Sequence, residues 1–340
     1  MRKKELLARI LSPLMQGGLL RRLCLRNGNV RILALVYHRV YDDPDRLAWS
    51  DPELRSADVA GFRSQMELVA RHFFPLTLDQ LPDVLDGSLD CPRPPVLVTF
   101  DDGYRDNYEV VLPILLETGV PANFFVSTGY IGTERLFWFD YLYMICRFLP
   151  PGRHELPGLP GRHVLGDELG RHRVALSWIE HCFGLPADEV DAIVEEADSL
   201  YGAVVPDEAR EFSLAMDWGQ VRALGEAGMG IGSHTVSHPL LRNCDDKRRR
   251  HELAESREQL ERQLGRRVDC FAYPVGKDFA IPDDGRSLRA ETGYRYFFSY
   301  EPGVISPASD AASLPRMPVE FGQSRAWMKA MLALPEVFHD

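Results

Sequence analysis

The feature that most constrains the fold is the regular alternation of strand-like and helix-like segments along the 340-residue chain. Seven short runs, rich in aliphatic, β-branched and aromatic residues, are predicted as strands: 31–38, 94–100, 121–129, 229–233, 268–274, 294–300 and 314–319. Five segments with apolar residues at helical spacing lie between them: 57–72, 107–120, 217–228, 245–265 and 284–292. Asp58 and Asp217 are predicted N-caps, and Gly119 and Gly265 are predicted helix ends. Because strand–helix–strand units favour parallel strands joined by right-handed crossovers, we expect an α/β sheet or barrel.

One stretch, residues 133–216, breaks this alternation. It begins with an aromatic helical segment, WFDYLYMICRFL, continues through the Gly/Pro-rich PPGRHELPGLPGRH, and ends in more helical sequence. We expect a helical insertion between two barrel units, placed as a lid or as a substrate-side subdomain. The predicted organisation is an N-terminal amphipathic segment at 1–30, a barrel built from 31–132 and 217–340, and this insertion.

Composition narrows the range of partners. The net charge of -11 argues against a general nucleic-acid surface, because phosphate binding needs a basic face. Six scattered cysteines without a CxxC pair indicate reduced thiols rather than a disulfide framework. No run is long and apolar enough to span a bilayer.

The basic, leucine-rich start leaves two interpretations open. Its apolar residues recur at helical spacing: Leu6, Leu7, Ile10, Leu11 and Leu14. A helix packed on its own domain is favoured over one that rests on a membrane surface. Charged residues interrupt any apolar core of a signal peptide, so we expect a cytoplasmic protein, with peripheral contact to the inner face of the membrane as the second option.

Polar residues follow several predicted strands. VLVTFDDGY ends in the adjacent Asp101 and Asp102, and SHTVSHP places His234 and His238 four residues apart. One helical turn between these histidines would put both imidazoles on one face. Two neutral imidazoles and a carboxylate form a half-open site for a divalent transition metal. Taken separately, the acidic pair could be a turn and the histidines surface residues.

In combination, these residues resemble the polysaccharide deacetylase family, the NodB-homology or family-four carbohydrate esterases. TFDDGY is similar to the family's first motif, SHTVSHP to its second and FAYPVG to a variant of its third, and the resemblance covers 31–132 and 217–319. It implies a distorted (β/α) barrel of about seven strands. It also implies removal of N- or O-acetyl groups from sugars with a divalent metal, zinc first, with cobalt, nickel or manganese as alternatives.

The same resemblance assigns roles to individual residues. It makes Asp101 the general base and Asp102, His234 and His238 the metal ligands, so that a metal-activated water attacks the acetyl carbon. The backbone N–H of Val275 would then bind the oxyanion, aimed by a turn that Pro274 helps to fix.

Two departures from the family pattern lead to further hypotheses. Ala272 stands where the third motif usually carries an arginine that orients the base, and Arg316 in LPRMPV is our candidate replacement. The family's last motif, whose histidine is the general acid, is missing from the C-terminal region. LVYHRV at 35–40 is similar to exopolysaccharide-type deacetylases with a circularly shifted motif order, which makes His38 the predicted acid. A strand-end histidine bonded to backbone is the alternative.

The remaining candidates carry weaker signals. Tyr104, Asn107 and Tyr273 could line a sugar site or could equally be packing residues. The basic stretch KRRRH at 247–251 is predicted as a solvated helix face, with contact to an anionic carrier lipid as the alternative.

The function that this sequence indicates is metal-dependent removal of an acetyl group, in the first place N-acetyl, from a sugar of a polysaccharide or its lipid-linked or oligosaccharide precursor. An O-acetyl esterase or an amidase with the same site is one alternative. A catalytically silent carbohydrate-binding or scaffold protein on the same fold is the other.

Overall fold

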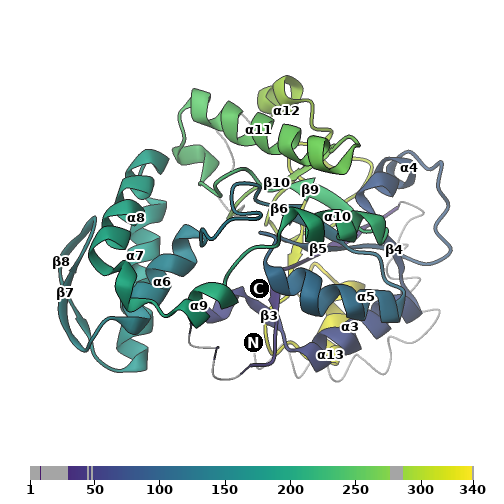
Figure 1. The fold of residues 1–340 in the computed structure, drawn as a ribbon. Helices are drawn as coiled ribbons and strands as arrows, with labels where there is room; N and C mark the ends of the chain where they lie inside the picture. The colour runs from purple at the N-terminus through teal and green to yellow at the C-terminus, as the bar shows by residue number, and fades with distance from the viewer. Residues whose placement is uncertain (1–7, 9–29, 44–45, 47–48, 276–285, 339–340) are drawn as a thin grey trace.

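The centre of the molecule is a curled sheet of parallel strands that forms a half-barrel (Figure 1). The computed structural model describes residues 8, 30–43, 46, 49–275 and 286–338. Seven strands follow one another in the order β11-β10-β9-β6-β5-β1-β12, and β4 also pairs with β5. The bounds are β1 (Leu33–Tyr37), β4 (Phe74–Leu76), β5 (Pro95–Phe100), β6 (Asn123–Val126), β9 (Gly230–Ser233), β10 (Cys270–Ala272), β11 (Tyr296–Phe298) and β12 (Met317–Pro318).

Each of the seven predicted strand segments contains one strand of this path, so the predicted distorted barrel of about seven strands is confirmed. Strands β1 and β5 are buried along their whole length and pair in register, Leu35 opposite Val98. Such continuous burial is expected of a parallel sheet covered on both faces. Strand β4 was not predicted, because FPL is too short to show periodicity.

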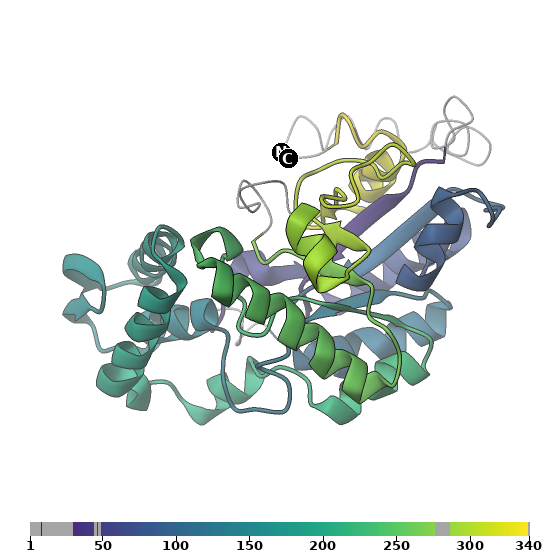
Figure 2. The same cartoon turned by 90° about the horizontal axis from the view of Figure 1, so that it is seen from above.

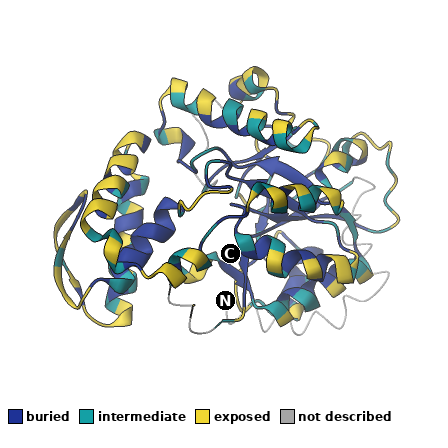
Figure 3. Ribbon diagram, viewed as in Figure 1, coloured by how far each residue is buried: buried dark blue, intermediate teal, exposed yellow. Residues whose placement is uncertain are grey.

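Helices cover the outer face of the sheet, with their exposed sides turned to solvent (Figure 3). They are α3 (Val59–His72), α4 (Leu81–Leu85), α5 (Leu112–Thr118), α10 (Trp218–Glu226), α11 (Asp246–Leu264), α12 (Arg286–Thr292) and α13 (Arg325–Ala333). The predicted caps are confirmed where the sequence showed them. Asp58 and Asp217 accept hydrogen bonds from the first turns of α3 and α10, and Gly119 and Gly265 end α5 and α11 in the left-handed conformation.

Short elements complete the half-barrel. Strand β2 (Arg39–Val40) pairs in parallel with β3 (Arg55–Ala57) beside the strand ends. Single 3-10 turns are formed by η2 (Pro52–Leu54), η3 (Leu78–Gln80), η5 (Gly202–Val204) and η6 (Leu241–Asn243), and the π-helical η4 (Asn107–Val111) leads directly into α5.

The insertion, residues 133–216, leaves the sheet after β6 and returns before α10, and it lies to one side of the half-barrel (Figure 2). It contains α6 (Trp138–Phe148), β7 (Gly152–Leu156), β8 (Leu159–Leu165), α7 (Glu168–Phe183), α8 (Ala187–Tyr201) and α9 (Asp207–Phe212). The predicted helical insertion did not include a hairpin, which the Gly/Pro-rich stretch between its helices forms with two antiparallel strands. Pro157 and Gly158 make its turn, and Gly158 has a φ of 72° that favours glycine.

Other expectations have different outcomes. The predicted N-terminal amphipathic segment lies almost wholly outside the described residues. Within the described part of the chain, no helix has the length and apolar character needed to cross a bilayer. The five cysteines that the structure describes are all free thiols.

Candidate metal centre

The predicted polar residues gather at the carboxyl edge of the sheet. Asp101 and Asp102 follow β5, His234 follows β9 and His38 follows β1, which are the positions where parallel α/β folds collect their functional side chains. All four line one cavity of about 480 Å³. The sheet topology therefore joins motifs that lie more than a hundred residues apart in the sequence.

Asp102, His234 and His238 form a compact buried cluster. Each offers one ligand atom, and these three atoms lie within 4.8 Å of one another. The Asp102 Oδ1 atom is 3.4 Å from His234 Nε2 and 3.2 Å from His238 Nε2. The Ala272 carbonyl accepts a hydrogen bond from His234 Nδ1 at 2.8 Å, which leaves the Nε2 lone pair of that ring facing the carboxylate.

This donor set fits a divalent cation. Both carboxylate oxygens of Asp102 are buried, and neither has a hydrogen-bond partner among the described residues. Buried carboxylates are rarely left without partners, because desolvation of a charge is costly. One carboxylate and two imidazoles converging on one point are the ligands expected of a half-open site for a transition metal.

The pKa directions agree with the protonation states that metal ligands need. Burial alone would raise the pKa of Asp102, but its contacts with the two imidazoles hold that pKa well below its ordinary value. Burial lowers the pKa of His238. The cluster therefore favours an ionised carboxylate beside a neutral imidazole.

The backbone of this site is unusual. Asp102, Thr235, His238 and Val275 are the non-glycine residues with positive φ in the described chain, at 74°, 70°, 56° and 59°. Such conformations cost on the order of 1–3 kcal/mol each and persist only where the surroundings impose them. The expectation that one helical turn aligns His234 and His238 was wrong, because a loop with two left-handed residues brings the imidazoles together.

The segment after β6 fixes this loop through its carbonyl groups. The carbonyls of Thr235 and Val236 accept hydrogen bonds from the N–H groups of Thr128 and Gly129, at 3.0 and 2.8 Å. The hydroxyl of Tyr130 donates to the Ser237 carbonyl and the Trp138 indole donates to the His238 carbonyl. Four consecutive carbonyls are therefore held in place.

The partner of Asp101 is an arginine and not an imidazole of the cluster. Arg316, directly before β12, donates to both of its carboxylate oxygens, at 2.6 and 2.7 Å. The same guanidinium donates to the Ser299 carbonyl and is completely buried. Burial alone would raise the pKa of Asp101, but the charge of Arg316 outweighs it and holds that pKa below its ordinary value. Arg316 thus has the geometry that a base-orienting residue requires.

His38 and Val275 both line the cavity. The His38 backbone is fixed, because its N–H donates to Ser56 Oγ and its carbonyl accepts from Asn107 Nδ2, both at 2.9 Å. Its imidazole lies 6.0 Å, centre to centre, from the ring of Tyr300, which also lines the cavity. Val275 follows β10 at the place predicted for an oxyanion-binding N–H, directly after the buried Pro274.

The structure corrects the weaker site assignments. Tyr104 and Asn107 are fully buried, and Tyr273 is nearly so. Each donates a hydrogen bond to protein: Tyr104 to Asp140, Asn107 Nδ2 to the His38 carbonyl and Tyr273 to the Ala312 carbonyl. None of the three lines the cavity, so the packing interpretation is the one that fits.

The insertion supplies a wall that sequence reasoning missed. Apolar side chains of α6 and α7 face the cavity: Phe139, Leu176, Ile179 and Phe183. Glu180 and the turn at 51–54 complete this side. In the sequence, these residues look like any amphipathic helix, so only the suggestion of a substrate-side subdomain pointed toward them.

A curled parallel half-barrel with functional side chains at its carboxyl edge defines the NodB-type class of α/β deacetylase folds. The sequence model of the polysaccharide deacetylase family matches residues 89–297, more than half of the chain, and the protein belongs to this family.

The individual proteins that resemble this chain have low sequence identity to it. YxkH of Bacillus subtilis (strain 168), itself assigned as a polysaccharide deacetylase, is 21% identical over 229 residues, which cover 67% of this chain and 53% of YxkH. The chain therefore matches about half the length of this curated relative. The Streptococcus pyogenes deacetylase PplD, solved in complex with acetate, aligns with a TM-score of 0.57 and 18% identity over 87% of this chain and 95% of its own. IcaB from Ammonifex degensii aligns with a TM-score of 0.55 and 18% identity over 89% and 96%. At these identities the solved structures support the fold alone.

Proposed function

We propose that this protein is a metal-dependent hydrolase that removes an N-acetyl group from a sugar of a polysaccharide or of its oligosaccharide or lipid-linked precursor. The observation that carries the proposal is that two adjacent carboxylates have different partners. Asp102 faces two imidazoles, whereas both carboxylate oxygens of Asp101 accept hydrogen bonds from Arg316. A purely structural metal site would not need a second carboxylate oriented beside it.

A divalent metal held by Asp102, His234 and His238 would supply a Lewis acid that acidifies water and polarises a carbonyl. Asp101, ionised and fixed by Arg316, is placed to accept the proton that the attacking water loses. The Val275 N–H donates to the developing oxyanion. His38 donates a proton to the departing nitrogen across the same cavity.

The presence of His38 in the cavity favours the amide over the ester. An amine leaves poorly unless a general acid protonates its nitrogen, whereas an alcohol needs less assistance. The apparent loss of the third-motif arginine was the sequence feature that favoured a silent binding protein. The bidentate contact of Arg316 with Asp101 removes that argument.

The test is acetate release from N-acetylglucosamine oligomers and from O-acetylated sugars, each with and without a chelator. We expect chelator-sensitive release, faster from the N-acetylated oligomers. Preferential release from the O-acetylated sugars would make the protein an esterase. Sugar binding without acetate release from any substrate, in metal-loaded protein, would support the silent binder.

A further inference from the structure

Helix α7 lines two cavities with one continuous face. Near its C-terminus, Leu176, Ile179 and Phe183 face the cavity that contains the metal cluster. Near its N-terminus, Leu169, His172 and Ala175 line a second cavity of about 380 Å³. At a rise of 1.5 Å per residue, Leu169 and Phe183 are about 21 Å apart along the helix axis. This face is longer than a single sugar ring can cover.

The two cavities adjoin at the turn that contains η2. Pro52 lines the second cavity, whereas its neighbours Asp51, Glu53 and Leu54 line the cavity of the metal cluster. Ala175 and Leu176 likewise belong to different cavities although they are consecutive in α7. A chain molecule that leaves the metal cluster along α7 therefore enters the second cavity.

The chemistry of the second cavity suits a neutral sugar. The hydroxyl of Tyr143 and His172 Nδ1 are hydrogen-bonded at 3.0 Å, and both can also bond a ligand hydroxyl. Apolar surface for the C–H face of a ring comes from Leu169, Ala175 and Pro52.

The positive charges at this cavity already have partners. Arg147 forms an ion pair with Glu168. The guanidinium of Arg171 donates to the carbonyls of Cys146 and Leu149 at 2.9 and 2.7 Å. Among the described lining residues, Arg171 keeps one net positive charge, but its Nε and Nη1 atoms already donate to backbone carbonyls. The side chains of Tyr143 and His172 therefore make the hydroxyls of a neutral glycan the better match.

We propose that the N-terminal half of α7 forms a subsite for a further, uncharged unit of the same glycan whose acetyl group is removed at the metal cluster. This inference rests on the proposed function and assigns the chain-length preference to the insertion. The substrate is then an oligomer or polymer, and the second cavity contributes to binding rather than to chemistry.

Leu169→Arg tests this subsite, because Leu169 is 54% exposed and a longer side chain there would fill the cavity. Leu200→Arg on α8 is the matched control, since Leu200 is 58% exposed and contributes to none of the cavities described above. The substrates are N-acetylated oligomers of one to six units. We expect kcat/KM of the unaltered protein to rise with length. In Leu169→Arg, we expect kcat/KM for the long oligomers to fall about 10-fold because KM rises, and kcat/KM for the single unit to stay the same. Leu200→Arg should leave both values unchanged.

Titration of the same oligomers into Asp101→Asn, alone and combined with Leu169→Arg, measures binding without turnover. Tighter binding of long oligomers that Leu169→Arg abolishes is the expected result. Identical length profiles for the two leucine variants would overturn the subsite. Binding as expected but no acetate release by the unaltered protein would contradict the proposed function and not the subsite.

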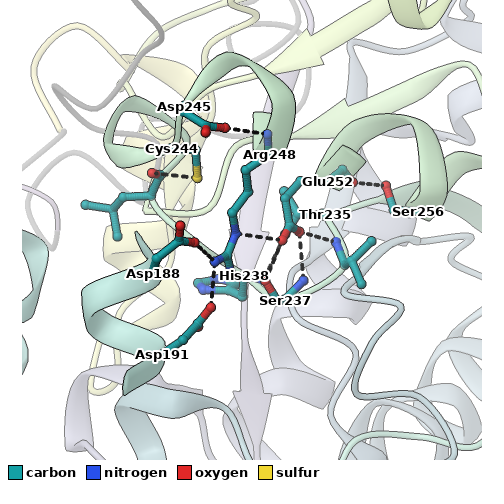
Figure 4. A network of polar contacts seen from close by, with 12 residues as sticks. Asp188, Asp191, Thr235, Ser237, His238, Cys244, Asp245, Arg248, Glu252 and Ser256 are labelled. Carbon is teal, nitrogen blue, oxygen red and sulfur yellow. Dashed lines mark hydrogen bonds and ion pairs between the residues drawn. The ribbon is translucent and has the colours of Figure 1, made fainter. Parts of the chain in front are cut away.

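A second inference concerns Glu252, which accepts hydrogen bonds from the N–H groups of the loop between the two histidines. Glu252 lies in α11 and is 2% exposed. Its carboxylate accepts hydrogen bonds from the N–H groups of Val236 and Ser237, both at 2.9 Å, and from the Ser237 hydroxyl at 2.6 Å (Figure 4). One carboxylate oxygen, Oε2, thus serves both of these amides.

Arg248 extends this contact to the insertion. Its Nε lies 3.5 Å from Glu252 Oε1, and its Nη2 donates to the Ser237 hydroxyl at 3.2 Å. Its Nη1 lies 2.5 Å from carboxylate oxygens of both Asp188 and Asp191 in α8 (Figure 4). The prediction of a solvated face for 247–251 is therefore wrong at Arg248, whose side chain is 19% exposed.

We infer that Glu252 is a positioning residue for the metal cluster and that Arg248 ties the insertion to the same loop. Thr235 and His238 adopt left-handed backbone conformations that the loop would relax from if its amides lost their acceptor. Such relaxation would move the His238 imidazole relative to Asp102, so metal affinity depends on a carboxylate that contacts no ligand atom.

The test is the metal affinity of Glu252→Gln, measured by competition with a chromophoric chelator, beside Glu258→Gln on the exposed side of the same helix. We expect Glu252→Gln to weaken zinc binding about 10- to 100-fold and Glu258→Gln to leave it unchanged. Ser237→Ala, which removes one of the three bonds, gives a smaller loss and serves if Glu252→Gln fails to fold. Unchanged zinc affinity in Glu252→Gln or in Ser237→Ala would overturn the inference.

Discussion

The carboxyl edge of the sheet and the insertion are built in different ways. All four non-glycine residues with positive φ in the described chain lie at the sheet edge or in the loops that follow it, and none lies in the insertion. The edge also buries Asp101, Asp102 and Arg316. The insertion instead consists of ordinary helices and a hairpin, which contribute an apolar wall. The reactive groups therefore depend on backbone conformations that the surrounding structure imposes, whereas regular helices and a hairpin are enough to shape the cavity.

The rigid sheet explains why strain can persist at its edge. Strands β1, β5, β6 and β9 are fully buried and hydrogen-bonded to neighbours on both sides. The loops that follow them are held by several bonds each, so the local cost of a left-handed residue is offset by contacts that would be lost together. Changes at the edge should therefore affect chemistry or metal binding, and changes in the insertion should affect substrate preference or stability.

The largest effect is expected for Asp101→Asn at the edge. The amide keeps the size of the side chain but cannot accept a proton from water, so kcat should fall about 10³-fold. Steady-state acetate release measures this, and the cavity-lining Glu180→Gln on α7 serves as the control from the insertion. A fall of similar size in Glu180→Gln, or less than a 10-fold fall in Asp101→Asn, would contradict the expectation that the reactive groups lie at the sheet edge and not in the insertion.

Arg316→Lys comes next. Lysine keeps the charge but cannot donate two parallel hydrogen bonds to a carboxylate, so Asp101 loses its fixed orientation. We expect kcat to fall on the order of 100-fold with little change in KM. Arg39→Lys is matched in burial and pairing, because Arg39 is 1% exposed and bonds Asp106 at 2.9 Å. We expect Arg39→Lys to lower the melting temperature but to reduce kcat much less than Arg316→Lys does. Equal losses of kcat in the two variants would mean that Arg316→Lys acts only by disturbing the packing.

The sequence predicts features of this protein that depend on neighbouring residues better than features that depend on residues far apart in the chain. The alternation of strands and helices and the caps Asp58 and Asp217 are local, and they were correct. The convergence of Asp102, His234 and His238 followed from the family motifs, but the loop that achieves it could not be read from a four-residue spacing. Glu252, buried in a charged helix, showed no signal at all, because its partners are backbone amides.

The Gly/Pro-rich hairpin shows a different limit. Its apolar residues are few, and Pro157–Gly158 marks a turn without indicating what flanks it. The position of α7 beside the cavity depends on how it packs against α6 and β8, which single-sequence periodicity does not encode.

A smaller effect is expected for Gly129→Ala, which probes the loop from its carbonyl side. A Cβ at Gly129 would lie 2.7 Å from the Val236 carbonyl oxygen, closer than such contacts allow. The loop between the histidines must shift, so zinc affinity should fall about 10-fold. Gly166→Ala is the control in the insertion, since a Cβ there meets no atom within 4 Å. Equal zinc affinity for the two variants would show that the edge is less constrained than we describe.

The smallest effect on catalysis is expected for Asp140→Asn, where the two regions meet. Asp140 of α6 accepts a hydrogen bond from the Tyr104 hydroxyl at 2.7 Å, and burial raises its pKa to about 7. The unfolded chain releases this proton near pH 4, about three pKa units lower. Between those values the folded state binds more protons, so stability falls as the pH rises and levels off above pH 7.

Asparagine can still accept the Tyr104 bond but does not titrate. Asp140→Asn should therefore abolish a loss of stability of up to about 4 kcal/mol between pH 4 and pH 7. Urea unfolding at pH 4 and pH 8 measures the difference. Parallel pH profiles for the two proteins would mean that Asp140 is ionised in the folded state.

The most direct test of the account is the metal content of Asp102→Ala and Asp101→Asn, purified alongside the unaltered protein and loaded with zinc. If Asp102 and the two histidines hold the ion while Asp101 stays outside, Asp101→Asn retains about one zinc per chain and releases acetate about 10³-fold more slowly, whereas Asp102→Ala loses the zinc. Loss of zinc from Asp101→Asn, or full zinc occupancy in Asp102→Ala, would contradict the assignment of the two carboxylates.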